Sequence, residues 1–126
     1  MPKTDPCSIR FSTHPAGLRA DVRGEGTFEN TLGYWTQILA EVLEKKPPGL
    51  LLIDETTGGP LFTFQWQALV EAMRGKGLEQ VRIAHVRPRG LQQIEHCEIF
   101  AREAGIEARV FTDETQADLW LRHGGD

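Results

Sequence analysis

The segment at 49–60, GLLLIDETTGGP, restricts the fold more than any other part of the chain. Four aliphatic residues follow Pro47, Pro48 and Gly49, and two carboxylates and a Gly-Gly-Pro sequence come after them. Successive side chains of a strand point to opposite faces, so this apolar run predicts a central strand that is buried on both faces. Such a strand needs a covering layer on each side, which the other elements must supply.

The N-terminal part predicts a β-hairpin. Residues 9–13 and 18–23 alternate apolar and polar side chains on either side of the turn sequence HPAG at 14–17. Period-2 alternation is typical of strands with one buried and one solvated face. We expect the inward side chains to be Leu18, Ala20 and Val22, and the outward ones to be Arg19, Asp21 and Arg23.

Helical spacing of apolar residues predicts the first two helices. Thr27 is the expected N-cap of the first, and Pro47 and Pro48 end it. Its apolar stripe is Phe28, Leu32, Trp35, Ile38, Leu39, Val42 and Leu43. The second helix has Thr63 as N-cap, or Pro60 in its first turn, and ends at the glycines at 75 and 77. Its stripe is Phe62, Trp66, Leu69, Val70 and Met73.

Strands and helices alternate through the rest of the chain. Strands are expected at 81–86 and 106–111. A third helix carries Leu91, Ile94, Cys97, Ala101 and Ala104. Asp113 and Gln116 form a capping-box pattern for a last helix with Ala117, Leu119, Trp120 and Leu121. The order predicts an α/β fold with a mixed five-stranded sheet, an antiparallel hairpin followed by parallel strands, and about four helices, in one domain over 1–126 with its core at about 8–122.

Composition excludes several classes of function. A net charge of -4 and a pI of 5.6 leave no basic surface for nucleic acid. The longest apolar run is too short to cross a bilayer, and residues 1–6 lack the apolar core of a signal peptide, which predicts a cytoplasmic protein. Cys7 and Cys97 are expected to be free thiols, Cys7 near a mobile end and Cys97 on a helix.

The element order and four short segments resemble the STAS family of sulfate transporters and anti-sigma-factor antagonists, especially its bacterial members of unassigned function. The segments are 24–27 (GEGT), 51–54 (LLID), 81–84 (VRIA) and 110–113 (VFTD), the last followed by Ala117, Trp120 and Leu121. The resemblance covers about residues 8–122. It implies a regulatory or binding module without catalytic activity.

One difference from that family concerns phosphorylation. Anti-sigma-factor antagonists resemble one another in an Asp-Ser-Ser-Gly segment at the start of the second helix, where a serine is phosphorylated. This chain has LFTFQW at 61–66 instead. The remaining candidate phosphoacceptors are Thr57 and Thr63, together with Thr56.

Open sheets of this kind bind ligands beyond the carboxyl ends of their parallel strands. The residues expected there are Asp54, Glu55, Thr56, Thr57, Gly58, Gly59, Phe62, His85, Arg87 and Arg89. Glycines with arginines can hold an anion through backbone N–H groups and guanidinium charge. Asp54 or Glu55 with His85 can form an acid–base pair, although spacing identifies no nucleophile or oxyanion site beside it. The same residues can also be explained without a binding site, as solvated loops and as a carboxylate that caps the turn after a strand.

His96 and Cys97 are neighbours on the third predicted helix, where they point in different directions, so we expect no metal site there, and the sequence carries no cofactor motif. We predict a non-catalytic module that binds a protein partner or a small-molecule or lipid ligand through these loops. The solvated face of the hairpin is a second candidate surface, and an edge strand makes a homodimer an expected assembly. The alternative is a small enzyme or carrier with a pocket near Asp54 and His85 that binds an anion or an apolar molecule.

Overall fold

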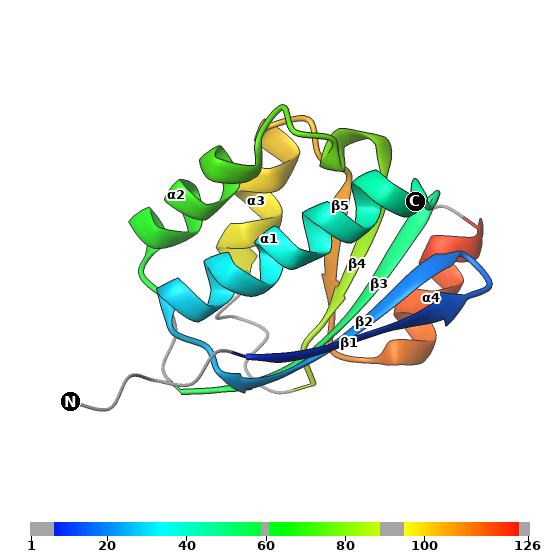
Figure 1. Ribbon diagram of the computed structural model, residues 1–126, viewed down its shortest axis with the longest axis horizontal. Coiled ribbons are helices and arrows are strands. Elements are labelled where there is room, and N and C mark those ends of the chain that lie inside the picture. The colour runs from blue at the N-terminus through cyan, green and yellow to red at the C-terminus, as the bar shows by residue number, and fades with distance from the viewer. Residues whose placement is uncertain (1–6, 59–60, 89–94, 124–126) are drawn as a thin grey trace.

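The computed structural model describes residues 7–58, 61–88 and 95–123. Strands and helices alternate in these ranges after an opening hairpin, as predicted (Figure 1). The elements are β1 Ser8–His14, β2 Gly17–Glu25, α1 Phe28–Lys45, β3 Gly49–Thr57, α2 Thr63–Met73, the 3-10 helix η1 Leu78–Gln80, β4 Arg82–Val86, α3 Glu95–Glu103, β5 Ala108–Phe111 and α4 Glu114–His123. The chain is therefore an α/β protein.

The five strands form one mixed sheet in the order β1-β2-β3-β4-β5. β1 and β2 are antiparallel, and every later neighbour pair is parallel. Because the parallel strands advance in one direction across the sheet, crossovers of one hand place their helices on one face. Figure 1 shows this arrangement, with α1, α2 and α3 on one face and α4 on the other.

β3 is covered on both faces, as its apolar run predicts. Leu50 and Leu52 belong to the large core beneath α1, α2 and α3. Leu51 and Ile53 belong to a smaller core, which α4 closes with Trp120. The four consecutive aliphatic residues are thus divided evenly between two layers.

The hairpin has the predicted buried face, whereas its other face is solvated only in part, because Arg19 and Asp21 are half-buried. Leu18, Ala20 and Val22 are buried in the large core. On the other face, the Arg19 guanidinium pairs with Glu114 of α4 at 2.8 Å. Gly17 starts β2 with φ +139°, and a Cβ atom there would lie 2.5 Å from the Gly49 carbonyl oxygen, so the turn into β2 requires glycine.

Two predicted helix caps are confirmed and one is wrong. Thr27 Oγ1 accepts a hydrogen bond from the Asn30 amide at 3.1 Å, and Asp113 Oδ1 accepts one from Thr115 at 2.9 Å. At α2, however, Thr63 is the first helical residue, and Phe62 occupies the N-cap position. The Phe62 side chain has no oxygen to accept from first-turn amides, although the Phe62 carbonyl accepts from the Gln65 amide at 2.9 Å and Gln65 Oε1 accepts from the Phe62 backbone N–H at 2.9 Å.

Some residues with core-like spacing lie at the surface. Leu43 of α1 and Leu119 of α4 are exposed, because each sits at the edge of its apolar stripe. Phe62, predicted as part of the α2 stripe, precedes the helix and is exposed. Leu91 and Ile94 lie outside the described residues.

Cys7 is a free thiol, as predicted, and it is buried. Its Sγ donates to the Glu25 carbonyl oxygen at 3.5 Å. Burial raises the pKa of this thiol, and the negative charge of Asp54 raises it further. The thiol is therefore held in its unreactive protonated form. In the part of the chain that the structure describes, no helix is long and apolar enough to cross a membrane.

Candidate functional site

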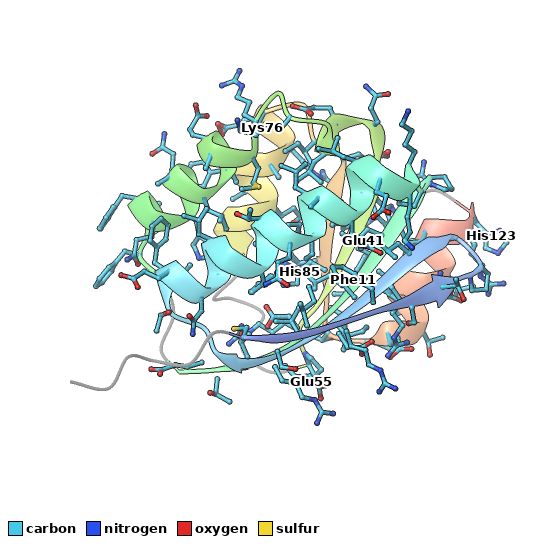
Figure 2. All side chains as sticks on the ribbon, viewed as in Figure 1. Phe11, Glu41, Glu55, Lys76, His85 and His123 are labelled. Atoms are coloured by element: carbon cyan, nitrogen blue, oxygen red, sulfur yellow. The ribbon has the colours of Figure 1, made fainter. Side chains whose placement is uncertain are left out.

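The alternation of β3 and β4 brings Asp54 and His85 together beneath the three-helix face. Leu52 of β3 is directly opposite His85 of β4, and Asp54 follows two residues later on the same face. Both side chains are buried, each residue being only 2% exposed. Figure 2 shows His85 inside the layer between α1 and the sheet, whereas Glu55, the next residue after Asp54, projects outward. Of the two predicted carboxylate partners for His85, the structure selects Asp54.

Asp54 accepts four hydrogen bonds, two on each carboxylate oxygen. Oδ1 accepts from the Thr56 amide at 3.0 Å and from the Thr56 hydroxyl at 2.6 Å. Oδ2 accepts from His85 Nε2 at 2.8 Å and from Arg87 Nη1 at 3.3 Å. A carboxylate has about four lone-pair sites, so this one is fully satisfied without water.

These donors keep Asp54 ionised. Burial alone would raise the pKa of its carboxyl, but the hydrogen bond and charge of His85, followed by the two bonds from Thr56, outweigh that effect. The net pKa lies well below the ordinary value for aspartate. The carboxylate therefore only accepts hydrogen bonds.

The ionised carboxylate fixes the tautomer of His85. Nε2 must carry the hydrogen that it donates to Asp54, so Nδ1 is the acceptor nitrogen whenever the ring is neutral. Such a carboxylate–imidazole pair is the arrangement that orients a general base in enzymes. Asp54 with His85 is one of the two carboxylate–imidazole pairs that the sequence predicts.

Arg87 is directed into the protein. Its Nη1 also donates to Thr56 Oγ1 at 2.9 Å, and its Nη2 donates to the Thr56 carbonyl oxygen at 3.4 Å. Thr56 lies against the start of α1, because the neighbouring Thr57 carbonyl accepts from the Gly26 amide at 2.8 Å. One network thus joins the end of β3 to the segments that follow β2 and β4.

The His85 ring lines a cavity between α2, α3 and the β4–β5 part of the sheet. The cavity volume is about 40 Å³. Its wall is formed by Trp35, Leu69, Val70, Met73, Leu78, Ile83, His85, Glu98, Ala101, Ile106, Ala108 and Val110. A single water needs roughly 10–15 Å³, so the space exceeds one water, and an apolar wall of this kind favours an apolar occupant.

Trp35 of α1 forms the end of the wall beside His85. Its ring meets the imidazole edge-on, with the two centroids 6.2 Å apart. The indole Nε1 is buried and has no hydrogen-bond partner among the described residues. Glu98, the other polar wall residue, accepts from the Val110 amide at 3.4 Å. None of the described wall residues carries a hydroxyl, thiol or amino group that could act as a nucleophile beside His85.

The other predicted site residues lie on the surface. Glu55 pairs with Arg23 at 3.1 Å, and Thr57 donates to the Gly24 carbonyl at 3.3 Å. Gly58 has φ +102°, which favours glycine. Thr57 and Thr63 are both exposed, as a phosphoacceptor must be. Gly59 and Arg89 lie outside the described residues.

Phe62 and Phe64 form an exposed aromatic pair at the start of α2. Each is 67% exposed, and their rings stack with centroids 5.8 Å apart. Both lie outside the cavity wall. The aromatic pair and the buried Asp54–His85 pair are therefore separate features.

The far wall of the cavity, on α3 and β5, does not follow from the sequence patterns. Ala101 and Ala108 stand there at buried positions where a larger side chain would fill the space. The one sequence signal for a cavity at this place is the presence of small residues within the apolar stripes. No group of three or more metal-ligating side chains occurs among the described residues, and the Cys97 side chain lies outside them.

No protein-family model and no curated protein sequence matches this chain.

Proposed function

We propose that this protein is a non-catalytic binding module whose ligand is a small apolar molecule, or the apolar end of a larger one, held between α2, α3 and the sheet. The observation that carries the proposal is the apolar cavity that reaches the Asp54–His85 pair. Ligand pockets commonly combine an apolar wall with a few fixed polar groups. Here His85 is the fixed polar group, because Asp54 sets its orientation.

The arrangement favours a carrier or sensor over the other predicted functions. The Arg87 guanidinium is occupied by Asp54 and Thr56, which argues against an anion held between the loops. Nucleophilic catalysis commonly pairs an imidazole base with a hydroxyl or thiol, and the described wall offers neither. A cavity of about 40 Å³ is far below the roughly 300–1,000 Å³ of drug-sized sites, so a large ligand requires α2 or α3 to move outward.

Membership of the STAS family is part of this proposal. It is supported by the hairpin-first order of elements and the short Asp-capped helix that follows the last strand. STAS regulators act through contacts with other molecules, which agrees with a binding module. The family assignment itself stays a prediction.

Native mass spectrometry of protein purified from its own cells tests the proposal. We expect the folded protein to carry a small molecule that denaturation releases. The variant Ala108→Val adds two methyl groups to the cavity wall and should lose the molecule while staying folded. Ala68→Val, on the exposed side of α2, is the matched control and should retain it. A bare wild-type chain, or equal retention in both variants, would contradict a ligand at this position.

A second candidate function is docking of a protein partner at the loop that follows β3. The specific observation is the stacked pair Phe62 and Phe64, because two neighbouring aromatic rings with such exposure are typical of contact surfaces. This function does not require the cavity. Loss of partner binding on replacing both rings, with ligand binding unchanged, would separate the two functions.

A further inference from the structure

β1 is a sheet edge open to another strand. Among the described residues, β1 pairs with β2 alone, and β5 forms the opposite edge. β5 has four residues, whereas β1 has seven and lacks proline and lysine. Natural proteins protect edges by shortness, charge or proline, and β1 carries a single charged residue, Arg10. The long edge is thus suited to pairing with an extended strand.

The seven residues of β1 are complementary to themselves in one antiparallel register. We consider a continuous sheet in which the helices of both copies lie on the same face. Two directly opposite residues then point to the same face of the sheet. Because side chains alternate between faces along a strand, the residue numbers of such a pair differ by an even number. Centring the pairing on Phe11 uses all seven residues. Centring it on Arg10 would place two arginines opposite each other, and centring it on Ser12 would leave Ser8 and Ile9 unpaired.

Side chains on both faces fit the Phe11 register. On the helix-covered face, Phe11 would meet Phe11 of the second copy, and each ring already packs partly against its own core. Figure 2 shows Phe11 on the side of β1 that faces α1. On the solvated face, Arg10 would stand opposite Ser12, and both are exposed. The register therefore extends an apolar row and opposes no like charges.

We propose that a second copy of this chain binds along β1, antiparallel and centred on Phe11, to give one ten-stranded sheet. The partner is a copy of this chain, because the fit arises from the pairing of β1 with its own sequence. The assembly leaves the cavity and the loop after β3 uncovered by the new strand pairing. It is independent of the ligand proposed above.

Analytical ultracentrifugation over a range of concentrations tests this interface with Ser12→Lys and Ser12→Glu. Lysine at 12 would face Arg10 of the other copy twice, and the dimer dissociation constant should rise by about 2- to 30-fold. Glutamate should lower it by a similar factor. Each new charge also faces Arg19 of its own β2, but that contact is present in monomer and dimer alike and cancels. Gln67→Lys, exposed on α2, adds the same charge away from β1 and should change nothing.

Cysteine placement tests the register separately. Phe11→Cys should form an intermolecular disulfide on mild oxidation, because opposite Cα atoms in a sheet lie within the range that a disulfide spans. Ser12→Cys should not form one. A wild-type chain that stays monomeric at every concentration, or a dimer equally stable in the lysine and glutamate variants, would overturn the interface. A disulfide at position 12 in place of 11 would overturn the register.

Discussion

At the scale of single residues, Asp54 determines the chemistry of the interior. Its carboxylate receives four hydrogen bonds and touches three side chains, which come from the ends of β3 and β4. Removing one partner from a buried charged network leaves the others unpaired, which commonly costs about 3–5 kcal/mol. Asp54→Asn should therefore lower the free energy of unfolding at neutral pH by an amount in that range.

Asp54→Asn should also change how the free energy of unfolding depends on pH in the acid range. The pKa of Asp54 is lower in the folded state than in the unfolded chain, so its contribution to stability is complete above about pH 4, the unfolded value, and is lost as the pH falls further. Unfolding in urea at a series of pH values should show a weaker acid dependence for Asp54→Asn than for the wild type. Glu55→Gln, an exposed neighbour with the same charge change, should keep the wild-type slope. An equal acid dependence in Asp54→Asn and the wild type would contradict the network.

The sequence was sufficient to bring Asp54 and His85 to the same end of the sheet, because parallel strands end at one edge. It was not sufficient to assign Arg87. From the sequence, an arginine at the end of a strand could equally bind an anion in solution. In the structure, the Arg87 guanidinium points inward because Thr56 and Asp54 offer it three oxygen atoms. Side-chain direction of this kind depends on packed neighbours and not on spacing.

At the scale of elements, the start of α2 is the least regular. Helix N-caps are usually Ser, Thr, Asp or Asn, and replacing such a cap by an apolar residue costs about 0.5–2 kcal/mol. Phe62 occupies this position with its ring exposed. Phe62→Asp should therefore raise the free energy of unfolding by about 1 kcal/mol, measured by thermal denaturation, since its carboxylate could accept a hydrogen bond from a first-turn amide of α2 and Gln65 already bonds the backbone of residue 62.

Phe62→Ala is the control for that gain. It removes the same ring but adds no oxygen, so its stability should stay close to the wild type. If the alanine and aspartate variants are equally stable, the missing N-cap does not limit the stability of α2. If Phe62→Asp is more stable than the wild type but binds a protein partner more weakly, the result would support docking of a partner at this surface. The natural phenylalanine would then serve binding at the expense of helix stability.

Most helices and strands could be predicted because their local signals agree. Thr27, the proline pair at 47 and 48, and Asp113 mark boundaries by backbone chemistry that acts within a few residues. The α2 boundary was assigned wrongly for the same reason, since Thr63 has the side chain of a cap but follows the true cap by one residue.

At the scale of the whole molecule, one sheet separates two cores that share β3. Because Leu50 and Leu52 serve one core and Leu51 and Ile53 the other, the loss of one layer should destabilise both. Trp120→Ala should lower the free energy of unfolding by about 3–5 kcal/mol, and circular dichroism and Trp fluorescence should report one common transition.

Leu119→Ala is the matched control on the same helix. Leu119 is exposed, so its truncation should change stability by less than about 0.5 kcal/mol. Two separate transitions in Trp120→Ala would show that the cores unfold independently. The two-layer plan itself was predictable from four consecutive aliphatic residues, but the cavity was not, because it depends on the difference in volume between alanine and a larger residue at Ala101 and Ala108.

The strand order also bears on how the chain folds during synthesis. Each new strand pairs with the one that left the ribosome just before it, so the sheet can grow by one edge at a time without waiting for a distant segment. The three-helix face is covered step by step along the way. Leu51, Ile53, Ala84 and Val86 are covered on the opposite face only after α4 has emerged. Until then the nascent chain exposes an apolar sheet, and this is the interval in which it most needs protection by a chaperone.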